Sequence, residues 1–148
     1  MTLRLLTGIA AMSLGLALAG ENLKYTPDPK WQPPADAVLR PNPLAGNTEV
    51  VGGGRKLFMR HCAECHSDDG SGRKRAADLQ LPVVQNQTDG ALFWKITNGN
   101  PPHRMPSFSR LPELQRWQLV LFVRTLKSDS PAATGTSNTR PDHASPGQ

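Results

Sequence analysis

The chain has 148 residues, of which 37% are hydrophobic and 20% are charged, and its formal net charge is +5. This length supports a single small domain. The chain contains two cysteines, so no third or fourth thiol is available to complete a zinc site.

The N-terminus has the features of a secretory signal peptide. Arg4 gives the start a positive charge, and an apolar run from Leu5 to Ala19 ends in the small-x-small sequence Ala17-Leu18-Ala19. The run is shorter than the roughly 20 apolar residues that span a bilayer. We therefore expect residues 1–19 to be cleaved during export, with an uncleaved N-terminal anchor as the alternative. Glu21 stands where a lipoprotein would carry its lipidated cysteine, which excludes lipidation.

Proline dominates the next segment, residues 20–47. Because proline lacks a backbone N–H and fixes its own φ angle, these residues are expected to break any helix or central strand. The prolines are Pro27, Pro29, Pro33, Pro34, Pro41 and Pro43. We expect an extended arm on the domain surface, anchored by Tyr25 and Trp31, and a floppy linker is the alternative.

Residues 48–127 form the predicted folded domain, which begins with a helix from about Glu49 to His61. The glycines at positions 52–54 are poor helix formers. The presence of at least one of these glycines in a helix must have another cause, such as a close approach of a second helix. An unstructured entry before Arg55 is the alternative.

Two further helices have clear start and stop signals. One begins at Thr88, a favourable N-cap, and ends at Asn98-Gly99, a favourable stop. The other begins near Pro112 and continues with apolar residues at helical spacing, namely Leu114, Trp117, Leu119, Leu121, Phe122 and Leu126. No convincing strand pattern is visible, so the predicted class is all-α. Three helices give a thin core, for which a bound cofactor would be structurally useful.

The C-terminal segment, residues 128–148, contains no large apolar residue and consists mainly of Ser, Thr, Pro, Ala, Gly, Asn and Asp. Such a segment cannot bury enough apolar surface to offset the entropy that ordering costs. We therefore expect a disordered tail.

The pentapeptide Cys62-Ala63-Glu64-Cys65-His66 is the most informative feature of the chain. In a Cys-x-x-Cys-His motif, two thiols on one side of a helical turn form thioether bonds to one haem, and the histidine binds the iron. The motif therefore predicts one covalent haem c. Cys62 and Cys65 would attach it, and His66 would be an axial ligand of the iron.

Other interpretations of the two cysteines fit the sequence less well. A redox dithiol is typical of a βαβ context and does not need the following histidine. A disulfide across two residues closes a loop too short to add much stability. A structural zinc site needs a second ligand pair, whereas His61, His103 and His143 are scattered.

The second axial ligand decides whether the iron is closed or open to exogenous ligands. Met105 is the favoured candidate because its proline-bracketed loop, residues 101–106, can hold a flexible side chain at low entropic cost. His103 is the alternative ligand, and a methionine that fills a core gap is the alternative role of Met105. Met59 and His61 lie on the attachment side of the motif and cannot easily reach the far face.

Several segments around the haem motif occur in a recognisable order. Gly54-x-x-x-Phe58 precedes the motif, Asp69-Gly70-Ser71-Gly72 follows it, and the segments at 88–99, 105–108 and 116–126 come later. In this order the stretch from about Gly54 to Leu126 resembles the class I (monohaem) cytochromes c of bacteria. The resemblance implies a small fold of three main helices around one haem. It also implies that Gly54 and Phe58 meet Leu119 and Phe122 where the first and last helices cross.

Two positions depart from the pattern of that family. Ser67 follows the motif histidine, where the family often has glycine. Lys74-Arg75 occupies the place of a Gly-Pro pair whose region supplies a carbonyl to the ring N–H of the ligand histidine. Such a hydrogen bond fixes the imidazole and tunes the metal. The usual support for His66 is therefore expected to be missing.

The resemblance implies a periplasmic one-electron carrier and not an enzyme, either soluble or as the cytochrome subunit of a dehydrogenase or respiratory complex. Residues 51–127 carry 12 Lys or Arg and 6 Asp or Glu, a net charge of +6. We expect a basic docking surface near Arg73-Lys74-Arg75 for an acidic redox partner, with a merely solvated loop as the alternative. Arg104 or Trp94 would contact the haem propionates.

Nucleic acid is not an expected partner, because the domain lacks an interleaved aromatic and basic platform, and no small-molecule substrate is expected. Two other classes of function compete with the carrier. One is a haem enzyme or gas sensor with an open sixth coordination position. The other is a Cys-x-x-Cys dithiol oxidoreductase without haem.

Overall fold

A computed structural model describes residues 27–73 and 75–127. The predicted signal peptide, Tyr25, Lys74 and the predicted tail at 128–148 lie outside the described residues. The described residues contain no β-strand, and the bridge between Asn100 and Met105 is isolated. The helical elements are α1 (Ala35–Val38), η1 (Thr48–Val50), α2 (Val51–His61), α3 (Ala63–His66), α4 (Pro82–Gln85), α5 (Asp89–Asn98), η2 (Pro101–His103) and α6 (Glu113–Thr125). The predicted all-α class is confirmed.

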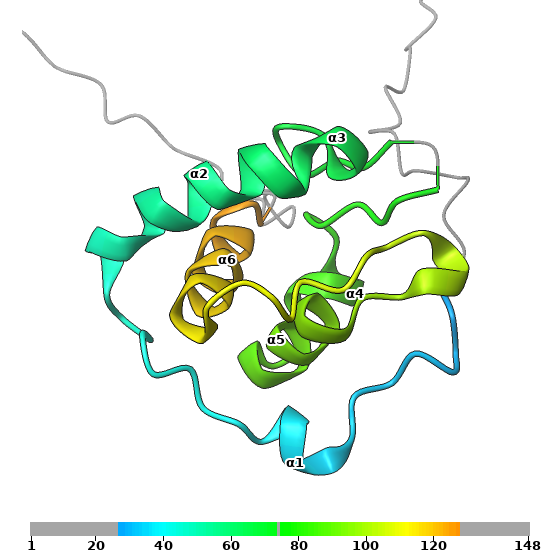
Figure 1. The fold of residues 1–148 in the computed structure, drawn as a ribbon, viewed down its shortest axis with the longest axis horizontal. Coiled ribbons are helices and arrows are strands. Elements are labelled where there is room, and N and C mark those ends of the chain that lie inside the picture. The colour runs from blue at the N-terminus through cyan, green and yellow to red at the C-terminus, as the bar shows by residue number, and fades with distance from the viewer. Residues whose placement is uncertain (1–26, 74, 128–148) are drawn as a thin grey trace, which may run out of the picture.

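The three predicted helices correspond to α2, α5 and α6 (Figure 1). Glu49, the predicted start of the first helix, falls in the 3-10 turn η1 that leads into α2. Thr88 caps α5 as predicted, because its side chain accepts a hydrogen bond from the backbone N–H of Ala91. Gly99 follows α5 with a φ of +65° and ends the helix.

Helices α2 and α6 cross at close range (Figure 1). A Cβ atom on Gly54 would lie 2.7 Å from the backbone carbon of Gln118 and 3.0 Å from Cβ of Phe122, so only glycine fits there. Beside Gly54, the ring centroids of Phe58 and Phe122 are 5.0 Å apart. Phe58, Phe122, Leu119 and Ala63 form one buried cluster, called here the crossing cluster. The expected crossing is confirmed, and it explains one of the three glycines.

A second cluster lies between α5 and α6. The rings of Phe93 and Trp117 stack with their centroids 3.9 Å apart, and Trp117 is fully buried. The guanidinium groups of Arg40 and Arg116 each lie 4.7 Å from the centroid of the Phe93 ring. Leu79 and Ile96 pack against this cluster and against the crossing cluster.

The proline-rich arm runs along α5, from the end of that helix to its start. Trp31 Nε1 donates a hydrogen bond to Gly99 O, just beyond α5, over 2.7 Å. Farther along the arm, Val38 O accepts a hydrogen bond from the Thr88 hydroxyl at the start of α5. The arm contains one helical turn, α1, so the expectation that the prolines would exclude any helix is wrong. The six residues between Pro34 and Pro41 leave room for that turn.

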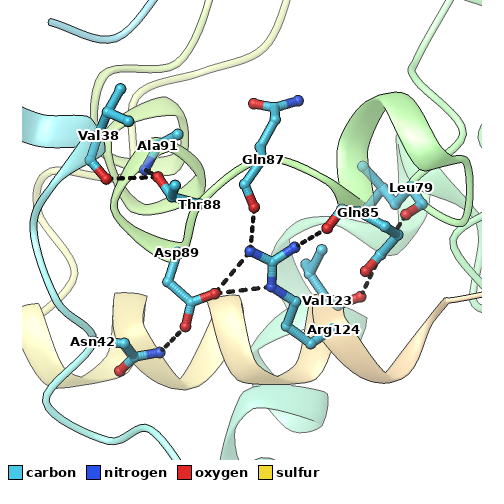
Figure 2. A network of polar contacts seen from close by, with 10 residues as sticks. All are labelled: Val38, Asn42, Leu79, Gln85, Gln87, Thr88, Asp89, Ala91, Val123 and Arg124. Carbon is cyan, nitrogen blue, oxygen red and sulfur yellow. Dashed lines mark hydrogen bonds and ion pairs between the residues drawn. The ribbon is translucent and has the colours of Figure 1, made fainter. Parts of the chain in front are cut away.

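Arg124 joins α6 to the start of α5, where its partner Asp89 also binds the arm (Figure 2). Its Nε donates to Asp89 Oδ1 over 2.8 Å, and its Nη1 and Nη2 donate to the backbone oxygens of Gln85 and Gln87. Asp89 Oδ2 accepts a hydrogen bond from Asn42 Nδ2 in the arm. Charged hydrogen bonds of this kind are about twice as strong as neutral ones. They fix α6, the start of α5 and the arm in one arrangement.

Within the ranges that the structure describes, no helix has the length and apolar character that crossing a membrane requires.

Candidate haem-binding site

The two cysteines and the histidine of the motif lie on a single helical turn at the end of α2. The backbone breaks at Cys62, and the short helix α3 then carries the rest of the motif. The N–H groups of Cys65 and His66 donate to Cys62 O over 3.1 and 2.9 Å. Ala63 is buried in the crossing cluster and anchors the turn. Both thiols are free, with Cys65 exposed and Cys62 half-buried.

The environment of Cys62 differs from that of a redox dithiol. Burial raises the pKa of the Cys62 thiol to about 12, and the neighbouring Cys65 adds to the shift. Catalytic dithiols instead have a cysteine whose pKa is lowered by positive charge or by a helix N-terminus. A neutral, half-buried thiol beside an apolar cluster does not match that requirement.

The imidazole of His66 is held by a backbone carbonyl. His66 Nδ1 lies 3.0 Å from Ala77 O, and a carbonyl can only accept, so Nδ1 carries the proton. Burial lowers the pKa of His66, while the hydrogen bond to Ala77 opposes that shift. The neutral ring therefore keeps its lone pair on Nε2, which is the form that a metal binds.

The expected loss of support for His66 is thus wrong. The carbonyl comes from Ala77, two residues beyond Arg75, because the chain after the motif turns back on itself. Gly72 N donates to His66 O, and Arg73 N donates to Cys65 O over 2.8 Å. No motif in the sequence marks Ala77, because every residue type has a backbone carbonyl that could accept this hydrogen bond.

Ser67 explains why a glycine often follows the motif histidine in the family that this chain resembles. Its φ of +64° lies in the left-handed region, which costs a residue with a Cβ roughly 1 kcal/mol. The Ser67 hydroxyl accepts a hydrogen bond from Arg73 Nε over 3.1 Å, which ties the turn to the returning loop.

Met105 lies half-buried in a loop that is pinned at both sides. Its N–H donates to Asn100 O over 3.1 Å, and its carbonyl accepts from Asn100 N over 2.8 Å. The backbone of Gly99 lies against it, because a Cβ on Gly99 would be 2.6 Å from Met105 O. Two positions later in the chain, the loop returns to α5, where Ser107 Oγ donates to Thr97 O.

The other ligand candidates have different surroundings. His103 is exposed, and its Nε2 lies 3.5 Å from Asp28 Oδ2 in the arm. The ring of His61 packs beside that of Phe108, and Met59 packs against the crossing cluster. Each of these three side chains therefore has a partner of its own within the described ranges.

Trp94 and Arg104 were predicted to contact the haem propionates. Within the described residues, no hydrogen bond, ion pair or ring contact joins either of them to the haem motif. Trp94 lines a cavity of about 150 Å³ together with Arg40 and Arg116. Arg104 is exposed, in a left-handed conformation at the end of η2. Asn100 was not predicted from the sequence. It is buried and makes both backbone hydrogen bonds to Met105. Its position directly before two prolines is the only feature of the sequence that could have marked it as a structural residue of the loop.

The donor atoms fit a covalently attached haem. Two thiols and one oriented imidazole share a turn, and a thioether is available on a pinned loop. These are the attachment and axial groups of a cytochrome c. No group of three or more His, Cys, Asp or Glu side chains in the described residues could form a separate metal site.

Comparisons with known proteins gave a similar solved structure and a matching family model. One solved structure, described as "KustC0563 c-type cytochrome", is 28% identical, covers 51% of this chain and 98% of its own, and superposes with a TM-score of 0.47. No curated protein sequence matches the chain. The family model described as "Cytochrome C oxidase, cbb3-type, subunit III" matches residues 50–123, which are half of the chain and contain α2 to α5 and most of α6. The chain therefore belongs to this family of monohaem cytochromes c, and its activity is haem-based electron transfer.

Proposed function

We propose that the protein is an exported one-electron carrier with one haem, attached through Cys62 and Cys65 and ligated by His66 and Met105. The observation that carries the proposal is the orientation of His66. Its Nδ1 is held 3.0 Å from Ala77 O on the turn that carries both thiols. When bound, the haem supplies an iron that takes up and releases one electron.

Each residue has a defined task in this proposal. The two cysteines fix the group to the turn, and the crossing cluster beside them keeps water away. His66 would bind the iron through Nε2. The hydrogen bond from Nδ1 to Ala77 O makes Nε2 a stronger electron-pair donor to the metal. Met105 would supply its thioether as the second protein ligand of the iron, which would raise the reduction potential and favour electron transfer over the binding of exogenous ligands.

Two other classes of function are less well supported. An enzyme or gas sensor needs an open sixth position, whereas the Met105 loop is pinned to Asn100 and Gly99. A dithiol oxidoreductase needs a reactive thiolate, whereas burial raises the pKa of Cys62 to about 12. Location in the periplasm rests on the signal-like sequence of residues 1–19.

Covalent attachment is tested by producing the protein in a periplasm with a cytochrome c maturation system. We expect haem that stays with the polypeptide after denaturation, one per chain, and a redox titration that follows a one-electron curve. Replacing both Cys62 and Cys65 by alanine should abolish the retained haem. The control Ser71→Ala, outside the motif, should keep it. Retention of covalent haem without both cysteines, or no haem in the parent protein, would contradict the proposal.

We further infer that the partner docks on a basic surface. Residues 51–127 have a net charge of +6, and Arg73 and Arg75 are exposed just after the motif. Opposite charge on a partner accelerates encounter and makes it sensitive to salt. Such a partner would be another redox protein, either a soluble one or part of a membrane-bound dehydrogenase or oxidase.

The rate of electron exchange with an acidic redox protein should therefore fall roughly tenfold between low and physiological salt. Arg75→Gln should lower the low-salt rate about twofold or more. Arg55→Gln removes the same charge from an exposed position two turns before the motif and is the matched control. Stopped-flow spectroscopy measures both rates, and equal effects of the two substitutions would refute a localised docking surface.

A further inference from the structure

The proline-rich arm contacts Gly99, whose backbone packs directly against Met105 in the loop of residues 101–106, called here the methionine loop. Trp31 Nε1 donates to Gly99 O over 2.7 Å, although the two residues are 68 positions apart. The Trp31 ring is half-buried, and the ammonium group of Lys95 lies 4.7 Å from its centroid. A Cβ on Gly99 would be 2.6 Å from Met105 O and 2.5 Å from the carbonyl carbon of Pro106. Trp31 therefore holds the backbone on which the loop rests.

A second contact of the arm reaches the loop through Asn100. Asp28 Oδ2 accepts a hydrogen bond from Asn100 Nδ2 over 3.3 Å, and His103 Nε2 lies 3.5 Å from the same oxygen. Asn100 is buried and makes both backbone hydrogen bonds to Met105. Asp28 is itself fixed, because its Oδ1 accepts from Lys30 N and its carbonyl accepts from Trp31 N. One chain of bonds thus runs from Asp28 through Asn100 to Met105.

We propose that Asp28 and Trp31 are positioning residues, together called here the clamp, that hold the methionine loop in its ligand-bearing conformation. This inference rests on the proposed ligation by Met105. The loop needs such a restraint because Pro101, Pro102 and Pro106 have no backbone N–H with which to tie it to the fold. A ligand group that is held in place before it binds loses less conformational freedom on binding.

We expect the arm to stay attached when these two contacts are removed, because it has separate hydrogen bonds at the start of α5. Asn42 Nδ2 donates to Asp89, and Val38 O accepts from Thr88. Variants at Asp28 and Trp31 therefore probe the loop and not the docking of the whole arm. Trp31→Phe keeps an aromatic ring for Lys95 but removes the N–H donor together with part of the ring system, whereas Asp28→Ala removes the acceptor for Asn100.

The test uses the ferric holoprotein with its haem attached. Imidazole is added as a competitor, and loss of the sulfur-to-iron charge-transfer band reports displacement of Met105. In Trp31→Phe combined with Asp28→Ala, we expect imidazole to bind about tenfold more tightly, because a less restrained loop gives up the iron more readily. Amide hydrogen exchange at Asn100 and Met105 should become faster by a similar factor.

Two variants serve as controls for the same protein. Asp36→Ala removes an exposed carboxylate from α1 in the same arm, and Leu39→Ala shortens an exposed apolar side chain at the end of that helix. Both should keep the parental imidazole affinity. A merely structural role of the clamp would lower the melting temperature without changing imidazole binding at 25 °C.

The outcomes distinguish a failure of the clamp from a failure of ligation by Met105. A parent protein with the charge-transfer band and a double variant with unchanged imidazole affinity would overturn the clamp while leaving ligation by Met105 in place. A parent protein without the band would overturn ligation by Met105 and the clamp with it. Tighter imidazole binding in the double variant, together with faster exchange at Asn100 and Met105, supports the clamp.

Discussion

Met105→Ala is expected to turn a low-spin, six-coordinate haem protein into one that binds carbon monoxide readily. Alanine removes the only thioether on the pinned loop and leaves the sixth position without its protein ligand. The two histidine candidates have other partners, because His103 lies beside Asp28 and His61 beside Phe108. Loss of a methionine ligand should also lower the reduction potential, by on the order of 100 mV.

Absorption spectra of the ferric and ferrous protein, with and without carbon monoxide, measure this change. Met59→Leu is the matched control, because Met59 is half-buried against the crossing cluster and should affect only packing. An unchanged spectrum in Met105→Ala would remove Met105 from the site. Loss of the low-spin spectrum in His103→Ala instead would identify the other candidate as the ligand.

Gly54→Ala is expected to destabilise the fold severely, by roughly 3 kcal/mol or more in the free energy of unfolding. The added methyl carbon would meet the backbone of Gln118 at 2.7 Å and Cβ of Phe122 at 3.0 Å. Neither neighbour is the flexible end of a long side chain, so α2 and α6 would have to separate. Because α2 leads directly into the haem turn, haem attachment should also become less efficient.

Gly52→Ala is the matched control and should have the opposite sign. A Cβ on Gly52 meets nothing within 4 Å, and alanine is a better helix former than glycine by about 1 kcal/mol. We therefore expect α2 to become more stable by up to that amount. Denaturant unfolding, followed by circular dichroism, compares the two variants in the same helix. Similar losses at both positions would show that the crossing does not depend on Gly54.

The sequence by itself determined the parts of the protein that depend on neighbouring residues. The helices α2, α5 and α6 were visible because apolar spacing, the cap at Thr88 and the stop at Gly99 are local signals. The haem motif was visible because attachment requires two thiols and a histidine on one turn. Met105 was predictable as a ligand because the prolines around it restrict the backbone locally, with no need for a contact to a distant residue.

Only the tertiary structure decided how these parts are held together. The support of His66 comes from the carbonyl of Ala77, and any residue type supplies a carbonyl. The bond from Trp31 to Gly99 and the contact of Gly54 with Gln118 join positions far apart in the chain. The sequence contained the glycines and the tryptophan but not their partners, because such contacts arise from the packing of helices and not from local spacing.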